Sequence, residues 1–396
     1  MSNLRSIPRW PSSTKHSSIR DLFNVAIVGT GFVADLYMRS LQTFADIRVI
    51  RAYDRDPTRL REFCCFWHVT PTGSLDELLA DGEDRPTTHL VLNLTNPSEH
   101  HAVTKRCLER RHNVYSEKPL ATNMEDAKEL HTLALSRKLF LTSAPCSHLS
   151  ESAQTLRWAV DQRLVGNPLL VYAELDDDFI TQAPYGKWRS ESGAPWPYRD
   201  EFEVGCTVEH AGYYLTWLMM IFGPVKTVVA ASAELVIPKL ANLPRSAPDF
   251  STAALFFRSG VVARLTCSIV APHNHCLRLV GDGGVLEIDE CWNNAAPVRL
   301  RKRHVIRRRL YNSPFARTLR APGAGHPRVG RRGSASMNFA LGPAALLKAM
   351  SRGAPNKPYA DFALHLNEVT LAIQNAGDSA GAQGIDTEFS YPDSRP

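Results

Sequence analysis

The chain has no hydrophobic run long enough to cross a bilayer. Its longest uncharged apolar stretch, AGYYLTWLMMIFGPV (211–225), falls short of the roughly 18–20 residues that a membrane-spanning helix needs. The eight cysteines (64, 65, 107, 146, 206, 267, 276 and 291) form no CxxC pair and have no zinc-binding spacing. We therefore expect reduced thiols in a cytoplasmic protein, without disulfides, a metal site or a transmembrane segment.

The first 20 residues contain no acidic residue and lack the apolar core of a secretory signal. They are basic and rich in Ser and Pro. We expect a disordered tail over residues 1–21, with an organelle transit peptide as the alternative.

One segment accounts for the net charge of +6. Residues 299–332 hold twelve Lys and Arg and no Asp or Glu, so the rest of the chain would carry −6. A local block of this kind does not indicate a nucleic-acid-binding protein. Its first part, RLRKRHVIRRRL (299–310), alternates like a strand with a solvated face. Contact with a substrate phosphate, an acidic surface or an acidic partner subunit is the alternative.

The length of 396 residues and the 44% hydrophobic content predict two domains. Apolar strand-like runs alternate with helix-like segments from residue 24 to residue 143. This alternation predicts a doubly wound parallel sheet with helices on both faces, an α/β Rossmann fold. The expected strands are 24–28, 47–53, 88–94, 113–116 and 139–143, and the expected helices are 32–44, 57–67, 99–110 and 123–137.

The pattern changes after residue 150. A helix near 150–163 and a strand at 168–175 precede an aromatic loop (181–200) and a long apolar helix at 205–222. Later strand-like runs are joined by tight turns, RSG (258–260) and GDGG (281–284), which predict an open, mostly antiparallel sheet. Helices are expected near 337–351 and 361–376. We assign residues 22–146 to a dinucleotide-binding domain and 147–396 to an α+β substrate and oligomerisation domain.

The first strand runs directly into GTGFVA (29–34), a G-x-G-x-x-A that opens a helix. Such a loop lets the backbone approach a pyrophosphate at a helix N-terminus, so Gly29, Thr30, Gly31, Phe32 and Val33 are candidate cofactor ligands. An acid follows the second strand. Asp54 is placed to hold the adenosine ribose, which favours NAD. The neighbouring Arg55 could instead hold a 2′-phosphate, so NADP is the alternative.

The stretch SEKPLA (116–121) follows the fourth strand, and TNPSEH (95–100) follows the third. Together with GTGFVA and the late GDGGVLEID hairpin, these motifs resemble the glucose–fructose oxidoreductase/inositol dehydrogenase/MocA family over roughly residues 22–290. The resemblance implies a nicotinamide-binding Rossmann domain and a C-terminal domain with an open sheet. It also implies that Thr95, Asn96, Pro97, His100 and Glu117 belong to the cofactor site.

In that family the lysine of the E-K-P motif contacts the reacting hydroxyl, and the bond before the proline is often cis. Carried over, that lysine is Lys118. The chemistry agrees, since hydride transfer from a carbinol requires a proton carrier within about 3 Å of the hydroxyl oxygen. Lys118 also follows a strand, at the edge of the sheet where open α/β sheets bind ligands. A solvated turn is the alternative for a lone lysine.

The sequence departs from the family in its long apolar helix. Where the family has D-x-G-x-H, this chain has HAGYY, with His210 in place of the aspartate and Tyr214 in place of the histidine. Residues four apart share a helical face, so both are candidate acid/base groups. The alternatives are that the aromatic residues of this helix are core residues, or that the usual chemistry is lost.

The loop before this helix combines aromatic and charged residues, which suits a sugar-like ligand. Its candidate substrate contacts are Trp188, Arg189, Trp196 and Tyr198. A structural or dimer-interface role for the two tryptophans is the alternative.

We expect an NAD(P)-dependent oxidoreductase that acts on a secondary alcohol or ketone of a sugar, nucleotide sugar or cyclic polyol. A dehydrogenase of an aromatic-acid cis-dihydrodiol is one alternative, and a non-catalytic dinucleotide-binding regulator is another. The expected partners are a small-molecule substrate and further copies of the chain, as a dimer or tetramer, and no nucleic acid.

Overall fold

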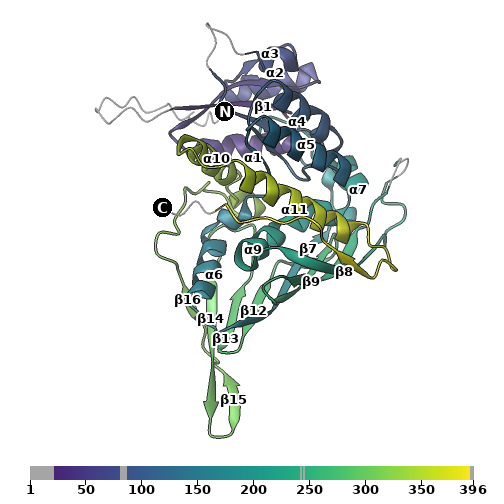
Figure 1. Ribbon diagram of the computed structural model, residues 1–396. Helices are drawn as coiled ribbons and strands as arrows, with labels where there is room; N and C mark the ends of the chain where they lie inside the picture. The colour runs from purple at the N-terminus through teal and green to yellow at the C-terminus, as the bar shows by residue number, and fades with distance from the viewer. Residues whose placement is uncertain (1–21, 81–86, 241–242, 244–245, 393–396) are drawn as a thin grey trace, which may run out of the picture.

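The computed structural model describes residues 22–80, 87–240, 243 and 246–392, so the tail expected over residues 1–21 lies outside the described residues. The first half of the chain forms a parallel six-stranded sheet of order β3-β2-β1-β4-β5-β6 (Figure 1). Its strands are β1 (Phe23–Val28), β2 (Ile47–Tyr53), β3 (Thr70–Pro71), β4 (Leu90–Asn93), β5 (Val114–Ser116) and β6 (Leu141–Ser143). This order, with its reversal between β1 and β4, is that of a Rossmann fold and confirms the predicted class.

Both faces of this sheet are buried, because apolar residues alternate into two separate cores. In β1, Val25 and Ile27 enter one core, whereas Ala26 and Val28 enter the other. Helices connect the strands: α1 (Phe32–Leu41), α2 (Pro57–Trp67), α3 (Leu75–Leu78), α4 (His100–Glu109) and α5 (Met124–Ser136). The start of α2 is fixed locally, since the Asp56 side chain caps it and Pro57 opens it.

The second half forms an open sheet of order β15-β14-β13-β12-β7-β10-β9-β8-β17, with β11 added to β7 and β16 to β14. Within this second sheet, the β7–β10 pair is the only parallel one among the described strands, so the expected mostly antiparallel sheet is confirmed. The strands are β7 (Pro168–Phe179), β8 (Val225–Ala233), β9 (Phe250–Phe257), β10 (Val262–Ser268), β11 (Val270–Asn274), β12 (Leu277–Gly281), β13 (Gly284–Ile288), β14 (Val298–Ile306), β15 (Arg309–Asn312), β16 (Arg317–Leu319) and β17 (Ala382–Gly384).

One face of the open sheet is covered by helices. These are α6 (Glu151–Asp161), α8 (Cys206–His210), α9 (Gly212–Phe222) and part of α11 (Lys357–Gln374), while α7 (Tyr198–Val204) lies beside the cleft between the two sheets. None of the described helices is long and apolar enough to cross a membrane.

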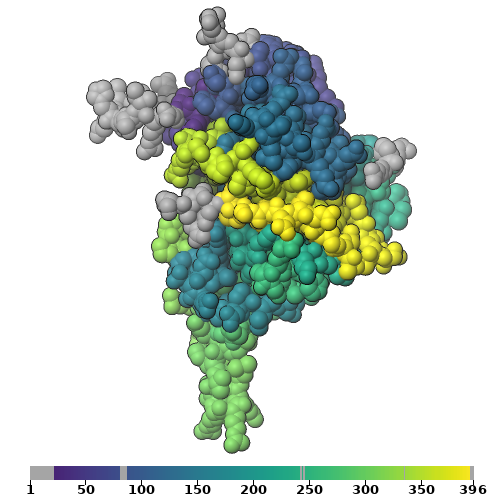
Figure 2. All heavy atoms as spheres, viewed as in Figure 1, coloured from purple at the N-terminus to yellow at the C-terminus, as the bar shows by residue number. Residues whose placement is uncertain are grey.

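The two C-terminal helices connect the halves of the molecule. Helix α10 (Leu341–Ser351) places Leu346 and Leu347 in a core of the parallel sheet. Helix α11 crosses the middle of the molecule (Figures 1 and 2), with Ala363 in the second core of the parallel sheet and Phe362 in the core of the open sheet. Both helices follow the domain boundary predicted at residue 146, and both also pack against the parallel sheet.

The basic block forms a hairpin of β14 and β15 that projects away from the rest of the molecule (Figure 2). Near its base, Arg301 pairs with Glu287 at 2.8 Å, and towards its tip Val305 and Leu310 are exposed. The hairpin lies at the opposite end from the parallel sheet (Figure 1).

Candidate active site

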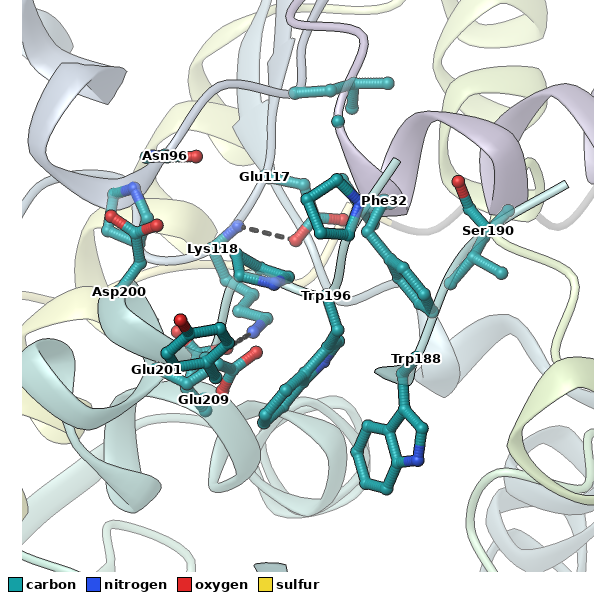
Figure 3. A pocket seen from close by; sticks show the side chains of 18 of the residues that line it. Phe32, Asn96, Glu117, Lys118, Trp188, Ser190, Trp196, Asp200, Glu201 and Glu209 are labelled. Atoms are coloured by element: carbon teal, nitrogen blue, oxygen red, sulfur yellow. Dashed lines mark hydrogen bonds and ion pairs between the residues drawn. The ribbon is translucent and has the colours of Figure 1, made fainter. Parts of the chain in front are cut away.

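A cleft of about 980 Å³ lies between the carboxyl ends of the parallel strands and the second half of the chain (Figure 3). One side is formed by the loops after β1, β4 and β5, and the other by the loop before α7, by α7 and α8, and by Trp292. Open α/β sheets bind ligands at this edge. The described lining includes Gly31, Phe32, Val33, Thr95, Asn96, Pro97, Glu117, Lys118, Asp177, Trp188, Arg189, Trp196, Tyr198, Glu201, Glu209, His210, Tyr213 and Trp292. The described lining includes no residue of the basic block 299–332.

The glycine loop contains two glycines with different roles. Gly29 has φ +91°, and a Cβ there would lie 2.6 Å from the Leu94 carbonyl group, so the turn depends on glycine. Gly31 has an extended φ of −74°, and a Cβ there would meet no atom within 4 Å. It borders the cleft at the start of α1, where free N–H groups and the helix dipole attract an anion. The residues present therefore fit a dinucleotide pyrophosphate.

Asp54 holds this loop in place. Its Oδ2 accepts hydrogen bonds from the Thr30 N–H at 2.7 Å and the Thr30 hydroxyl at 3.0 Å, and its Oδ1 accepts from the Asp56 N–H at 2.8 Å. Thr30 and Asp54 do not line the cleft directly. Arg55 pairs with Glu99 at 3.0 Å. An acid therefore lies beside the guanidinium that, in the alternative to NAD, would hold the 2′-phosphate of NADP.

His100 lies behind the cleft and not in it, unlike the role that the family resemblance implies. The ring is fully buried, with Nδ1 at 2.6 Å from the Pro119 carbonyl oxygen and Nε2 at 2.8 Å from the Thr95 carbonyl oxygen. Burial lowers the pKa of His100. The ring thus connects the loop after β4 to the turn after β5, which is a positioning role.

The turn after β5 presents Lys118 to the cleft, and its bond to Pro119 is cis. Glu117 supports this turn, because its Oε1 accepts from the Tyr37 hydroxyl at 2.7 Å and its Oε2 from the Lys118 N–H at 3.1 Å. The Lys118 Nζ forms an ion pair with the carboxylate of Glu209 on α8 (Figure 3). Sequence reasoning missed Glu209, whose only local signal is its place one residue before His210.

His210 also lines the cleft, with its Nε2 at 3.4 Å from the Asp177 carboxylate at the end of β7. Its Nδ1 is buried and has no partner among the described residues. The His210 ring also contacts Trp292, at 6.2 Å between centroids. A histidine with a carboxylate on one nitrogen and its other nitrogen free is suited to proton transfer.

Tyr214 does not face the cleft, so the expectation that it shares a face with His210 is corrected. Its side chain is fully buried, its hydroxyl donates to the His275 carbonyl oxygen, and burial raises its pKa well above the ordinary value. The Tyr214 ring packs in the core of the open sheet, edge to face with Trp217 at 5.4 Å between ring centroids. Tyr213 lines the cleft in its place and contacts Trp292 at 5.9 Å between ring centroids.

All four expected substrate contacts in the aromatic loop line the cleft. Trp188 and Trp196 meet edge to face at 5.0 Å between centroids, which leaves apolar surface towards the cleft (Figure 3). Arg189 donates to carbonyl groups of its own loop.

This loop is fastened to α1 of the parallel sheet. The buried Asp35 carboxylate accepts from the Ser192 N–H at 2.9 Å and the Ser192 hydroxyl at 2.8 Å, and Arg39 pairs with Glu191. The cleft is therefore closed on this side by contacts between the two halves of the chain.

A second acid adds to the charge at Lys118. Burial raises the pKa of Glu201, against the lowering effects of Lys118 and His210. Glu201, Glu209 and Asp177 thus line the cleft together with one lysine and one histidine. Figure 3 shows Glu201 and Glu209 beside Lys118. Such a set can move a proton to or from a hydroxyl and accept hydrogen bonds from further hydroxyls.

Two family descriptions match the chain. Residues 23–144 match an oxidoreductase family with an NAD-binding Rossmann fold, and residues 153–287 match the GFO/IDH/MocA C-terminal domain.

Several known proteins are similar. Trans-1,2-dihydrobenzene-1,2-diol dehydrogenase from Homo sapiens is 24% identical over 274 residues, which cover 67% of this chain and 74% of the human protein. An uncharacterized oxidoreductase from Synechocystis is 25% identical over 276 residues, which cover 66% of this chain and 70% of that protein. A WlbA dehydrogenase from Chromobacterium violaceum, solved with NADH and UDP-GlcNAcA, has a TM-score of 0.68 at 18% identity over 94% of this chain and 98% of its own. This structural likeness supports the fold alone.

Proposed function

The chain belongs to the GFO/IDH/MocA oxidoreductase family, with an NAD-binding Rossmann domain, and on that premise we propose that it oxidises one carbinol carbon of a neutral, polyhydroxylated ring to a ketone, or reduces that ketone to the alcohol. The observation that carries this proposal is the ion pair of Lys118 with Glu209 at the edge of the parallel sheet, inside the cleft. The proposed substrate is a sugar, a nucleotide sugar or a cyclic polyol.

NAD, when bound, exchanges a hydride at its nicotinamide ring. We assign its pyrophosphate to the loop of Gly29, Thr30 and Gly31 with Phe32 and Val33, and its remaining contacts to Thr95, Asn96 and Pro97 at the cleft wall. Asp54 and Glu117 act from behind, the first by holding the glycine loop and the second by holding the Lys118 turn.

The residues of the chain manage the proton of the reacting hydroxyl. The Lys118 Nζ exchanges this proton with the hydroxyl oxygen, and the Glu209 carboxylate, its ion-pair partner, holds the Nζ in position. His210, oriented by Asp177, is a second proton carrier at the same wall of the cleft. Tyr214 has no part in this proposal, because its hydroxyl is bonded within the core.

The lining supports a neutral ring as substrate. Trp188, Trp196 and Trp292 offer apolar faces, while Asp177, Glu201 and Glu209 accept hydrogen bonds from hydroxyls. A carboxylate close to Lys118 would meet these acids, which disfavours an aromatic acid. A ring dihydrodiol without a carboxylate is the second candidate, favoured by the similarity to trans-1,2-dihydrobenzene-1,2-diol dehydrogenases.

The test combines cofactor binding with turnover. NADH binding is followed by fluorescence, and turnover of inositols, UDP-sugars and trans-dihydrodiols by absorbance of the reduced nicotinamide. We expect saturable NADH binding, turnover of at least one ring alcohol, and a loss of about 100-fold or more in kcat for Lys118→Ala with NADH affinity retained. Binding without any turnover would favour a non-catalytic regulator, and absence of dinucleotide binding would refute the proposal.

We also propose that the chain forms homo-oligomers through the outer face of the open sheet. Val229 on β8 is 40% exposed there, and Phe256 on β9 is 41% exposed. Exposed apolar side chains on neighbouring strands are typical of an interface. Light scattering on the purified chain should show the mass of two or four copies. We also propose a cytoplasmic location, as expected from the sequence.

A further inference from the structure

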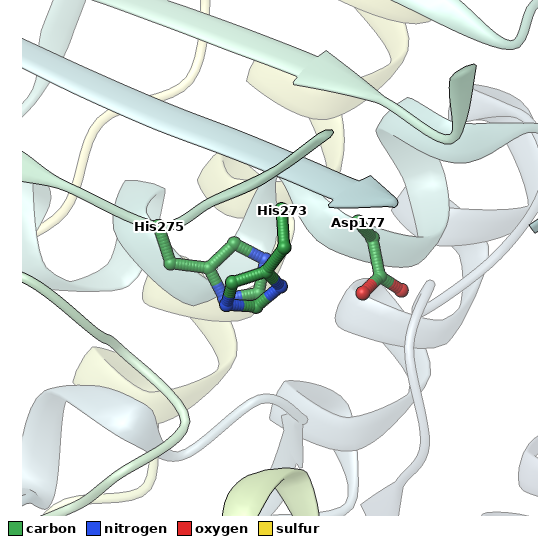
Figure 4. A group of neighbouring side chains, drawn as sticks. All are labelled: Asp177, His273 and His275. Atoms are coloured by element: carbon green, nitrogen blue, oxygen red, sulfur yellow. The ribbon is translucent and has the colours of Figure 1, made fainter. Parts of the chain in front are cut away.

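Beside the cleft, three metal-ligand side chains from separate segments come together (Figure 4). Asp177 is near the end of β7, His273 is in β11, and His275 follows β11. One ligand atom of each lies within 4.8 Å of the other two. The sheet register explains this meeting, because Asn274 pairs with Asp176, so that their neighbours His273 and Asp177 lie on a common face.

The HNH sequence at 273–275 puts both imidazoles on one side of the chain. Their ring centroids are 4.1 Å apart. Glu290, in the loop after β13, binds both rings: one oxygen lies 3.0 Å from the Nε2 of His273 and the other 2.8 Å from the Nδ1 of His275. A carboxylate behind a histidine is the usual outer partner of a metal ligand, since it fixes the ring and leaves the other nitrogen for the ion.

The nitrogen that Glu290 leaves free on His275 is buried. The side chain of His275 is 1% exposed, and its Nε2 has no hydrogen-bond partner among the described residues. When both rings donate to Glu290, the free nitrogens and the Asp177 carboxylate present only lone pairs to one another. These acceptors then face one another with no hydrogen-bond donor or positive charge from the described residues between them. A bound cation would supply that charge.

From this arrangement we propose that Asp177, His273 and His275 bind a divalent transition-metal ion such as Zn²⁺, with Glu290 orienting the two histidines. Two imidazoles and one carboxylate favour zinc or cobalt over magnesium or calcium, which prefer oxygen ligands. Ligand atoms around tetrahedral zinc are about 3.3 Å apart, so a small inward movement of the side chains completes the site.

The proposed ion would lie at the wall of the cleft. Asp177 lines the cleft and contacts His210, and three protein ligands leave a fourth position for water or a substrate oxygen. This goes beyond the proposed function, which needs no metal. The expectation of no metal site rests on sequence spacing, which does not bring together residues as far apart as 177 and 273. The proposed site departs from that expectation.

A second group, His101 with Asp126 and Glu129, is a natural comparison. It is more open to solvent, and Glu129 is already paired with Lys105 at 2.6 Å and with His101 at 2.6 Å. His101→Ala therefore serves as the matched control for His273→Ala, since each variant removes one partly exposed histidine from one group.

The experiment measures metal binding to the full chain and needs no substrate. The protein is stripped with a chelator, dialysed against equimolar Zn²⁺ or Co²⁺, and analysed for metal content and for the visible absorption of tetrahedral Co²⁺. We expect about one ion per chain in the wild type and in His101→Ala, and loss of the ion in His273→Ala and Asp177→Asn. Glu290→Gln should weaken binding about 10- to 100-fold.

Circular dichroism confirms that each variant is folded. The Co²⁺ spectrum of the wild type tests the site without relying on any variant. The proposal is overturned when the folded wild type retains no ion, when the spectrum lacks tetrahedral bands, or when His101→Ala removes the ion and His273→Ala does not. None of these results depends on turnover, so they leave the proposed oxidoreductase function to its own test.

Discussion

The ammonium group of Lys118 and the carboxylate of Glu209 form an ion pair that joins the turn after β5 to helix α8. The Glu209 side chain is 7% exposed and that of Lys118 is 19% exposed. A pair this far from water is sensitive to the loss of either partner, because the remaining charge is left without compensation. Glu209 therefore affects both the charge and the position of the lysine that we assign to the reacting hydroxyl.

Glu209→Gln should lower kcat about 10- to 100-fold with little change in NADH affinity, because the amide keeps the shape of the side chain but no longer pairs with the Lys118 ammonium group. Steady-state kinetics and an NADH fluorescence titration measure the two quantities.

Glu203→Gln is the matched control for this variant, because Glu203 lies on α7 and does not line the cleft. An unchanged kcat in Glu209→Gln, or an equal loss of kcat in Glu203→Gln, would contradict the role given to the pair.

The two loop glycines should separate folding from cofactor binding. Gly29→Ala forces a side chain into a left-handed turn against the Leu94 carbonyl group and should lower the free energy of unfolding by about 1–3 kcal/mol. Gly31→Val should leave stability within about 0.5 kcal/mol but weaken NADH binding at least tenfold, since its side chain enters the cleft. Urea unfolding and NADH fluorescence titration distinguish the two, and the opposite pattern would place the dinucleotide elsewhere.

The wild type should bind NADH more tightly than NADPH, because Glu99 neutralises Arg55. Glu99→Gln frees the guanidinium and should raise NADPH affinity about two- to fivefold, the factor that an exposed ion pair supports. NADH affinity, measured in the same fluorescence titration, is the internal control and should not change. A gain for both dinucleotides would show that Glu99 acts otherwise.

Acid should destabilise the fold through buried histidines. Burial lowers the pKa of His148 to about 3 and that of His365 to about 4. In the unfolded chain both titrate near their ordinary value of about 6.5, so below that pH the unfolded state binds more protons. The free energy of unfolding should therefore fall by about 1.4 kcal/mol per pH unit for each histidine as the pH drops from about 6.5 towards about 4.

His148→Gln isolates one of these contributions. The free energy of unfolding, measured with urea, should depend less steeply on pH in the variant than in the wild type. The difference in slope should correspond to the binding of about one proton. His304→Gln, at an exposed position on the projecting hairpin, should leave the slope unchanged. Equal slopes in the wild type and His148→Gln would show that this histidine is charged in the folded protein.

The fold could be predicted because its signals are local. The run NVAIV, the glycine turn and the acid after β2 each act within a few residues, and α2 begins at the expected Pro57. Lys118 could be selected for a related reason, since it follows a strand at the edge of the sheet where ligands bind. Its position needs only the order of the strands.

The partners in the cleft could not be predicted, because they are set by contacts between distant segments. Nothing in the letters VEH distinguishes Glu209 from a surface acid until α8 meets the turn after β5. Tyr214 lies in the core and Tyr213 at the cleft, although the spacing of four residues from His210 predicts the opposite. Asp177 meets His210 only through the sheet.

The position of helix α11 in the chain sets the order in which the two halves of the protein can finish folding during synthesis. The strands of the parallel sheet leave the ribosome first, yet Ala360, Ala363 and Leu364, which complete one of its cores, belong to a helix that ends at Gln374. Domains usually fold in the order of their synthesis. Here the dinucleotide-binding half must keep part of its apolar surface exposed until nearly the whole chain has been made, so the earliest segment is among the last to be finished.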